Sequence, residues 1–175
     1  RGLGDVYKRQ DELYLGMRFL DVALSSFIYQ MDGSVSPFGT DGAVMYFHPA
    51  QLGGLYKENR ILVNRGYLHM VFHCIFRHFG KPGIETRLWN LSCDIAVEHM
   101  IDGIYHRSVR YSRSLLRRET YRLLEKEKKT LNAERIYKIL KEEFLKEKEL
   151  AQLEKEFYVD DHKYLSLIHI SEPTR

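Results

Sequence analysis

Apolar residues recur every three or four positions along much of this chain, which is the spacing of amphipathic helices. This pattern predicts helices at residues 11–29, 50–57, 61–79, 90–103, 114–129 and 132–157, the last of them possibly interrupted. Residues 35–38 and 44–48 instead form short apolar runs on either side of a Thr40-Asp41-Gly42 turn, a pattern typical of a β-hairpin. We therefore expect an α+β fold that is mostly helical, with a small hairpin or sheet.

The two ends of the chain are related through the genetic code. Codons can be chosen that make residues 1–10 the reverse complement of residues 165–174, in frame and without a gap. The implied nucleotides resemble the adapters used to build sequencing libraries. We treat residues 1–10 and 165–175 as adapter-derived segments, and expect residues 11–164 to be an internal piece of a longer gene.

The remaining length suits a single domain, with a core at residues 11–111 and a helical extension of the same domain at residues 112–164. The formal net charge of +3 falls to +1 without the adapter-derived segments, which carry four basic and two acidic residues. Basic and acidic residues are interleaved, which argues against nucleic-acid binding. We expect no membrane span, because no apolar run is long enough. The two cysteines form no disulfide framework, which favours a cytoplasmic protein.

The helix at residues 61–79 carries His69 and His73, four positions apart and therefore about 40° apart on one face. They border an apolar arc that we expect to face the core, made of Val71, Phe72, Ile75, Phe76 and Phe79. The next helix carries carboxylates at the edge of a similar arc: Asp94, Glu98 and Asp102.

Two imidazoles and one carboxylate make up the three protein ligands of a catalytic zinc site. Asp94 follows His73 at the offset found in one class of zinc peptidases, and Glu98 one turn later can orient a ligand histidine. The pattern thus predicts one zinc ion held by His69, His73 and Asp94. The alternative is that both histidines are hydrogen-bonded core residues, while Asp94 and Glu98 cap or solvate their helix.

Other candidate ligands have simpler structural explanations. His78 lies about 180° from His69 on a continuous helix and near its end, where an imidazole can meet unpaired carbonyls. Cys74 and Cys93 are turned away from the predicted ligands and are expected to be small buried residues. Trp89 is expected to anchor the loop that enters the second helix. No role is assigned to His48, His99, His106 and His162.

The segments 67–73 and 88–98, YLHMVFH and LWNLSCDIAVE, resemble a bacterial family of metallopeptidase-like proteins. The resemblance extends over residues 11–164 and includes residues 40–42, 133–137 and 158–162. It implies a zincin-like fold, with His69 and His73 as metal ligands and Asp94 as the third. It also implies a von Willebrand factor A-like domain after this one, and a ring ATPase as a partner.

The sequence departs from the zinc-peptidase motif at Met70, where active zincins carry the glutamate that serves as general base. A thioether cannot accept a proton, so peptide hydrolysis is doubtful unless Glu98 or Asp102 replaces that base. Two functions follow from the sequence. One is a zinc-binding, zincin-like peptidase domain, and the other is a non-catalytic interaction or structural module.

Overall fold

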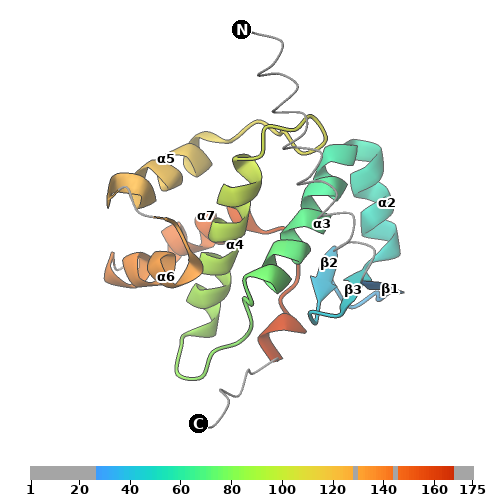
Figure 1. Ribbon diagram of the computed structural model, residues 1–175, viewed down its shortest axis with the longest axis horizontal. Coiled ribbons are helices and arrows are strands. Elements are labelled where there is room, and N and C mark those ends of the chain that lie inside the picture. The colour runs from blue at the N-terminus through green and yellow to red at the C-terminus, as the bar shows by residue number, and fades with distance from the viewer. Residues whose placement is uncertain (1–26, 128–129, 144–145, 168–175) are drawn as a thin grey trace, which may run out of the picture.

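The computed structural model describes residues 27–127, 130–143 and 146–167 (Figure 1). The strands are β1 (Ile28–Met31), β2 (Phe38–Thr40) and β3 (Val44–Phe47). The helices are α2 (Pro49–Glu58), α3 (Arg60–Ile75), α4 (Thr86–Asp102), α5 (Leu115–Leu124), α6 (Ala133–Glu142) and α7 (Glu147–Phe157), with short 3₁₀ turns at Glu125–Glu127 and Leu165–Leu167. The α+β class with mostly helical content is confirmed.

The three strands form one small sheet in the order β1-β3-β2. β2 and β3 pair antiparallel through the predicted turn, where Gly42 has a positive φ of 92°, so the hairpin is confirmed. Its first strand lies at Phe38–Thr40, so the predicted position at residues 35–38 is wrong. β1 pairs parallel with β3 and was not predicted. Ile28 and Tyr29 belong to this strand, so the helix predicted at residues 11–29 is wrong at its end. The rest of that prediction, residues 11–26, lies outside the described residues.

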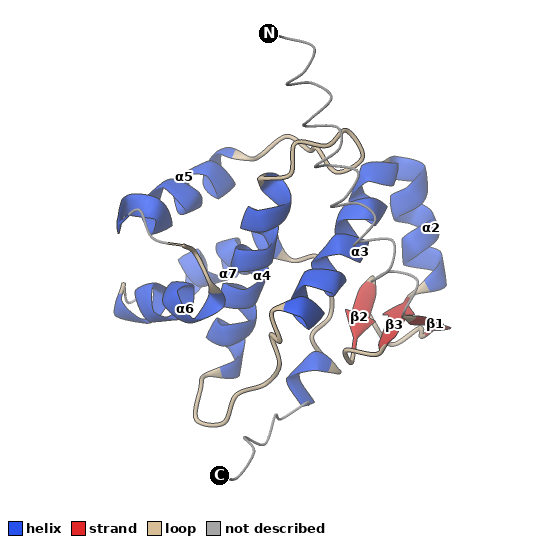
Figure 2. Cartoon of the chain, in the orientation of Figure 1, coloured by secondary structure: helices blue, strands red, loops and turns tan. Residues whose placement is uncertain are grey.

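The helix α4 lies at the centre of the described structure (Figure 2). One side of α4 packs against α6 and α7 and contacts α5 through Tyr121. Its other side packs against α3, which in turn contacts α2 and β2. The main core is formed by α4 and the three later helices, with Trp89, Ile95, Tyr121, Ile136 and Phe157 among its buried residues. The predicted helical extension therefore shares its core with α4.

Two helices of the charged stretch after residue 113, α5 and α6, each begin directly after a polar N-cap residue. Ser114 accepts a hydrogen bond from the backbone N–H of Arg117, and Asn132 accepts one from that of Arg135. The predicted helix at residues 132–157 is interrupted, since α6 ends at Glu142 and α7 starts at Glu147. The structure thus confirms these helices and the interruption.

The helix α3 is shorter than the predicted helix at residues 61–79. After Ile75 the chain turns at Arg77, whose φ of +54° lies in the left-handed region. The backbone N–H of His78 donates to the carbonyl of His73, and that of Arg77 to the carbonyl of Cys74, which together form a Schellman motif. Ile75 and Phe76 are 43% and 42% exposed, so placing them in the core was wrong.

The helix α4 begins at Thr86, four residues before the predicted helix start at Asn90, a residue type that favours the N-cap position. The additional turn places Leu88 and Trp89 in the main core, and this packing outweighs the capping preference of asparagine. The indole N–H of Trp89 donates to the carbonyl of Phe79 at 3.0 Å, so Trp89 does hold the loop between α3 and α4. It does so from within the helix.

Two glycines let backbone segments approach β2 closely. A Cβ at Gly66 of α3 would lie 2.3 Å from the ring of Phe38, so only glycine fits there. On the other side, Gly39 pairs with Asp161 in an isolated parallel bridge, and the N–H of Asp161 donates to the carbonyl of Phe38 at 2.7 Å. The chain after α7 is thereby fixed along the free edge of β2, next to α3.

Among the described residues, no helix is long and apolar enough to cross a membrane. The first of the residues assigned to the second adapter-derived segment, Leu165, is buried, and the hydroxyl of Ser166 accepts a hydrogen bond from Asn90. These contacts involve only the end of the described chain.

Candidate metal centre

Five side chains from three parts of the fold converge on one buried point. The helix α3 supplies His69 and His73, α4 supplies Asp94, and the extended segment after α7 supplies Asp160 and His162. Each offers one ligand atom, and these five atoms all lie within 4.8 Å of one another. The three residues predicted from the sequence are therefore brought together, with two further residues that were not predicted.

The Oδ1 atom of Asp94 is close to all three imidazoles. It lies 3.3 Å from the Nε2 atom of His69, 3.3 Å from that of His73 and 2.9 Å from that of His162. Both α3 histidines are fully buried, and the side chain of His162 is only 8% exposed. The histidines are therefore interior residues, whereas the sequence had placed His69 and His73 at the border of the core.

Asp160, on the segment after α7, lies close to the same three nitrogens. Its Oδ1 atom lies 3.3, 3.7 and 3.2 Å from the Nε2 atoms of His69, His73 and His162. Both carboxylate oxygens of Asp160 are buried, and neither has a hydrogen-bond partner among the residues that the structure describes. A buried carboxylate without such a partner carries a large desolvation cost, which a cation at its oxygens would offset.

The spacing of these atoms matches that of ligands around one ion. Nitrogen and oxygen ligands lie about 2.0 to 2.2 Å from zinc, so neighbouring ligand atoms are about 3 to 3.6 Å apart. Most of the observed N···O separations are 3.2–3.7 Å, longer than the roughly 2.7 to 2.9 Å of direct charge-assisted hydrogen bonds. This buried group of histidines and aspartates can hold a metal ion.

Glu98 orients His69 from behind. Its Oε1 atom lies 2.9 Å from the Nδ1 atom of His69, and a carboxylate can only accept, so Nδ1 carries the proton. In the neutral ring, the lone pair is then on Nε2, which faces the cluster. The predicted orienting role of Glu98 agrees with this geometry.

Glu98 is also fixed by two cations. Its Oε2 atom accepts from Arg65 at 2.6 Å and from Arg117 at 2.7 Å. Burial raises the pKa of Glu98, but His69, Arg65 and Arg117 outweigh burial and lower this pKa to about 2. Glu98 is therefore an ionised, fully engaged carboxylate that is poorly suited to accept a proton during catalysis.

Asp102, the other predicted substitute for the missing base, is engaged elsewhere. It accepts from Arg65 at 2.8 Å and from the hydroxyl of Tyr121 at 2.9 Å, and Arg117 lies 3.4 Å away. Asp102 does not belong to the five-residue cluster. The two carboxylates and two arginines form a buried, charge-balanced network behind His69.

His78 reaches the site in a way that the helical wheel did not allow. Because the Schellman motif reverses the chain after Ile75, the Nδ1 atom of His78 lies 3.2 Å from that of His73. Its ring therefore meets His73, whereas we had expected it to meet helix-end carbonyls. Burial, reinforced by the neighbouring His73, lowers the pKa of His78 to about 2, so its ring is neutral and can hold His73 through one hydrogen bond.

The two aspartates favour positive charge at the centre. Burial on its own lowers the pKa of His162, yet Asp94 and Asp160 raise this pKa to about 10. Burial likewise raises the pKa of Asp160, but the neighbouring histidines hold it well below its usual value. A metal cation meets the same electrostatic demand as a protonated imidazole.

Met70 faces away from this chemistry. It is 1% exposed and packs with Phe38, Met45 and Val71 in a small core between α3 and the sheet. Cys74 and Cys93 are free thiols that do not belong to the cluster. Cys93 is buried as predicted, whereas Cys74 is only partly buried. Burial raises the pKa of both thiols, so neither is a ready thiolate ligand.

Asp160 and His162 were not predicted as ligands, although residues 158–162 are part of the resemblance. The signal was their spacing: in an extended segment, residues two positions apart point to the same side. Asp161, between them, is the residue that pairs with β2. The sequence does not show that this segment pairs with β2, and this pairing is what brings the segment close to α3 and α4.

Comparison with family models, with curated proteins and with solved structures gives no match to this chain.

Proposed function

We propose that this domain binds one divalent transition-metal ion, zinc, through His69, His73, His162, Asp94 and Asp160. The observation that carries the proposal is the convergence of their five ligand atoms within 4.8 Å at a buried point. Three imidazole nitrogens and two carboxylate oxygens suit zinc, and also iron or manganese. The absence of a sulfur ligand argues against a cysteine-type structural zinc site.

We further propose that the metal has a structural role. Catalytic zinc sites have three protein ligands and keep a position open, whereas here five side chains surround one point. Glu98 and Asp102, the two candidates to replace the missing base, are bound by arginines, and Met70 lies in an apolar core. The metal would tie the segment that carries Asp160 and His162 to α3 and α4, so that binding and folding are coupled.

A zincin-like peptidase is the second candidate, and one observation favours it. A cavity of about 390 Å³ is lined by Asp94, Asp160 and His162, together with Asn90 and Tyr158, so the ligands border an open space. A zinc ion there would act as a Lewis acid toward a peptide carbonyl. Release of one carboxylate ligand would be needed to admit such a group.

The wider context implied by the resemblance belongs to the same proposal. In that context the domain would be a metal-stabilised module next to a von Willebrand factor A-like domain, and it would act with a ring ATPase. Such a module needs a stable binding surface and does not need to hydrolyse peptides. The buried centre supports such a role, because a metal that links three parts of the chain stabilises them together.

The experiment is metal removal and replacement. Protein stripped by a chelator should melt at a lower temperature, and one equivalent of zinc should restore the original value. The metal-loaded protein should not cleave a mixed peptide library. Cleavage that depends on added zinc would favour the peptidase, and failure to bind any divalent metal would exclude both functions.

A further inference from the structure

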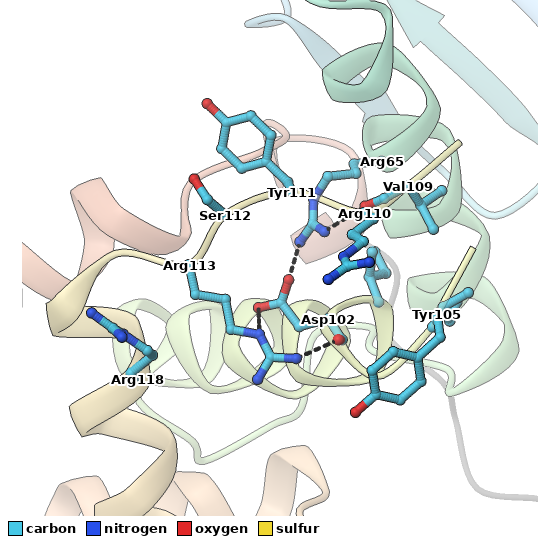
Figure 3. A pocket seen from close by; sticks show the side chains of 11 residues that line it. Arg65, Asp102, Tyr105, Val109, Arg110, Tyr111, Ser112, Arg113 and Arg118 are labelled. Atoms are coloured by element: carbon cyan, nitrogen blue, oxygen red, sulfur yellow. Dashed lines mark hydrogen bonds and ion pairs between the residues drawn. The ribbon is translucent and has the colours of Figure 1, made fainter. Parts of the chain in front are cut away.

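A second cavity has a volume of about 640 Å³ (Figure 3). It is bounded by the end of α4, the loop at residues 103–114 and the first turn of α5. Ligand-binding pockets in proteins usually have volumes of roughly 300 to 1,000 Å³, so this cavity has room for a molecule of nucleotide size. None of the five proposed metal ligands lines it.

The lining of this cavity is strongly cationic. Four arginines contribute to it, namely Arg65, Arg110, Arg113 and Arg118, whereas Asp102 is its only carboxylate. The sequence shows the same local bias, since the residues between Asp102 and Glu119 include five arginines, no lysine and no acidic residue. The formal net charge of the whole chain is only +3, so it does not reveal the local excess of positive charge in this segment.

Two of the four arginines hold the structure together. Arg65, with a side chain only 5% exposed, donates to Asp102 at 2.8 Å and to the carbonyl of Val109 at 3.0 Å, which fixes the loop to α3. Arg113 donates to the backbone carbonyl of Asp102 at 2.6 Å. Asp102 is therefore neutralised by its neighbours and does not cancel the charge of the other arginines.

The side chains of Arg110 and Arg118 have no hydrogen bond or ion pair with any residue that the structure describes. Their guanidinium groups are thus free to bind an anion at the cavity. Guanidinium groups recognise phosphate through paired N–H donors, which distinguishes arginine from the point charge of lysine. An arginine-only cationic cavity therefore favours a phosphate group.

Two tyrosines flank the arginines. Figure 3 shows Arg65 and Arg110 between Tyr105 and Tyr111, and both tyrosines line the cavity. Tyr105 and Tyr111 are 84% and 46% exposed, so both side chains are accessible to a bound molecule. An exposed aromatic face beside cationic groups is suited to stacking with a planar ring.

We propose that this cavity binds a nucleoside phosphate, with Arg110 and Arg118 contacting the phosphate groups and Tyr105 or Tyr111 stacking on the base. The proposal is independent of the metal centre, because the two sites share no ligand residue. The buried Arg65–Asp102 contact provides a rigid floor for the site.

The test is calorimetric titration of the metal-loaded protein with three probes: magnesium-ATP, tripolyphosphate and adenosine. We expect saturable 1:1 binding of ATP, weaker binding of tripolyphosphate and none of adenosine. Arg110→Ala and Arg118→Ala should each weaken ATP binding about tenfold, as expected for the loss of a charged hydrogen bond. Tyr105→Ala together with Tyr111→Ala should weaken ATP but leave tripolyphosphate unchanged.

The matched control is Arg107→Ala, an exposed arginine of the same loop that does not line the cavity. It should leave ATP binding unchanged. The proposal is overturned if ATP shows no saturable binding, or if Arg107→Ala weakens binding as much as Arg110→Ala does. It is also overturned if a single-stranded oligonucleotide binds far more tightly than ATP, since this would indicate an extended basic surface.

Discussion

The Nε2 atom of His162 lies 2.9 Å from the Oδ1 atom of Asp94, although Asp94 lies on α4 and His162 follows the last long helix. The contact depends on the pairing of Asp161 with β2, which turns both Asp160 and His162 toward the helices. A metal at this point would therefore join the sheet edge, α3 and α4. The stability of these elements should depend on the metal ion as a unit.

Replacing His162 tests whether the segment after α7 supplies ligands. We expect His162→Ala to lower zinc affinity at least tenfold and to reduce the zinc content of the purified protein, because an imidazole ligand is removed. Competition with a chelating dye would measure the affinity. The control is His99→Ala, which removes a histidine that contacts Glu125 outside the cluster. Unchanged zinc affinity in His162→Ala would show that this segment is not part of the site.

Glu98 and Asp102 offer a matched pair of substitutions, because both accept hydrogen bonds from Arg65. Only Glu98 contacts His69, so Glu98→Gln should weaken zinc binding by about 10- to 100-fold, whereas Asp102→Asn should not. Both variants should be destabilised, since each weakens the buried arginine network. Equal zinc affinities for the two variants would argue against an orienting role for Glu98.

Introducing the glutamate of the zinc-peptidase motif should not create an enzyme. Met70→Glu places a carboxylate in the apolar cluster of Phe38, Met45 and Val71, which should destabilise the fold by about 3 kcal/mol. Chemical denaturation and a peptide-cleavage assay would measure both effects. Met100→Glu, at an exposed position on α4, should be nearly neutral. Zinc-dependent cleavage by Met70→Glu would instead show that only the general base is missing.

The turn after α3 allows a stabilising substitution. Arg77 has a φ of +54°, a conformation that costs a residue with a Cβ about 1 kcal/mol and suits glycine. Arg77→Gly should therefore raise the free energy of unfolding by about 0.5 to 1 kcal/mol, as measured by denaturation. Because this turn places His78 against His73, zinc affinity should be unchanged or slightly higher. A loss of stability would mean that the side chain of Arg77 stabilises the fold by more than its left-handed backbone conformation costs.

The sequence predicted the parts of the fold that depend on local pattern. Hydrophobic periodicity placed the helices, and the predicted starts at residues 114 and 132 coincide with the observed N-caps Ser114 and Asn132. The spacing of residues within the two predicted helices, and the offset between these helices, can be read from the sequence. His69, His73 and Asp94 could therefore be predicted as one group of ligands. Prediction from the sequence failed where distant packing decides the structure, as at the start of α4, where burial of Trp89 overrides the cap at Asn90.

The remaining site residues depend on non-local geometry. His78 reaches His73 only because the chain reverses at Arg77, and a wheel drawn for a continuous helix cannot show this. Asp160 and His162 reach the centre only because Asp161 pairs with β2. The unpredicted β1 also required a parallel partner, β3, that follows it in the chain.

The central claim is that three histidines and two aspartates hold one metal ion, and X-ray absorption spectroscopy of the zinc-loaded protein tests it most directly. We predict one zinc ion per chain, in a shell of about five nitrogen and oxygen atoms at about 2.0 to 2.2 Å, with histidine scattering and no sulfur. A sulfur contribution from Cys74 or Cys93, or a protein that retains no stoichiometric zinc, would contradict the claim.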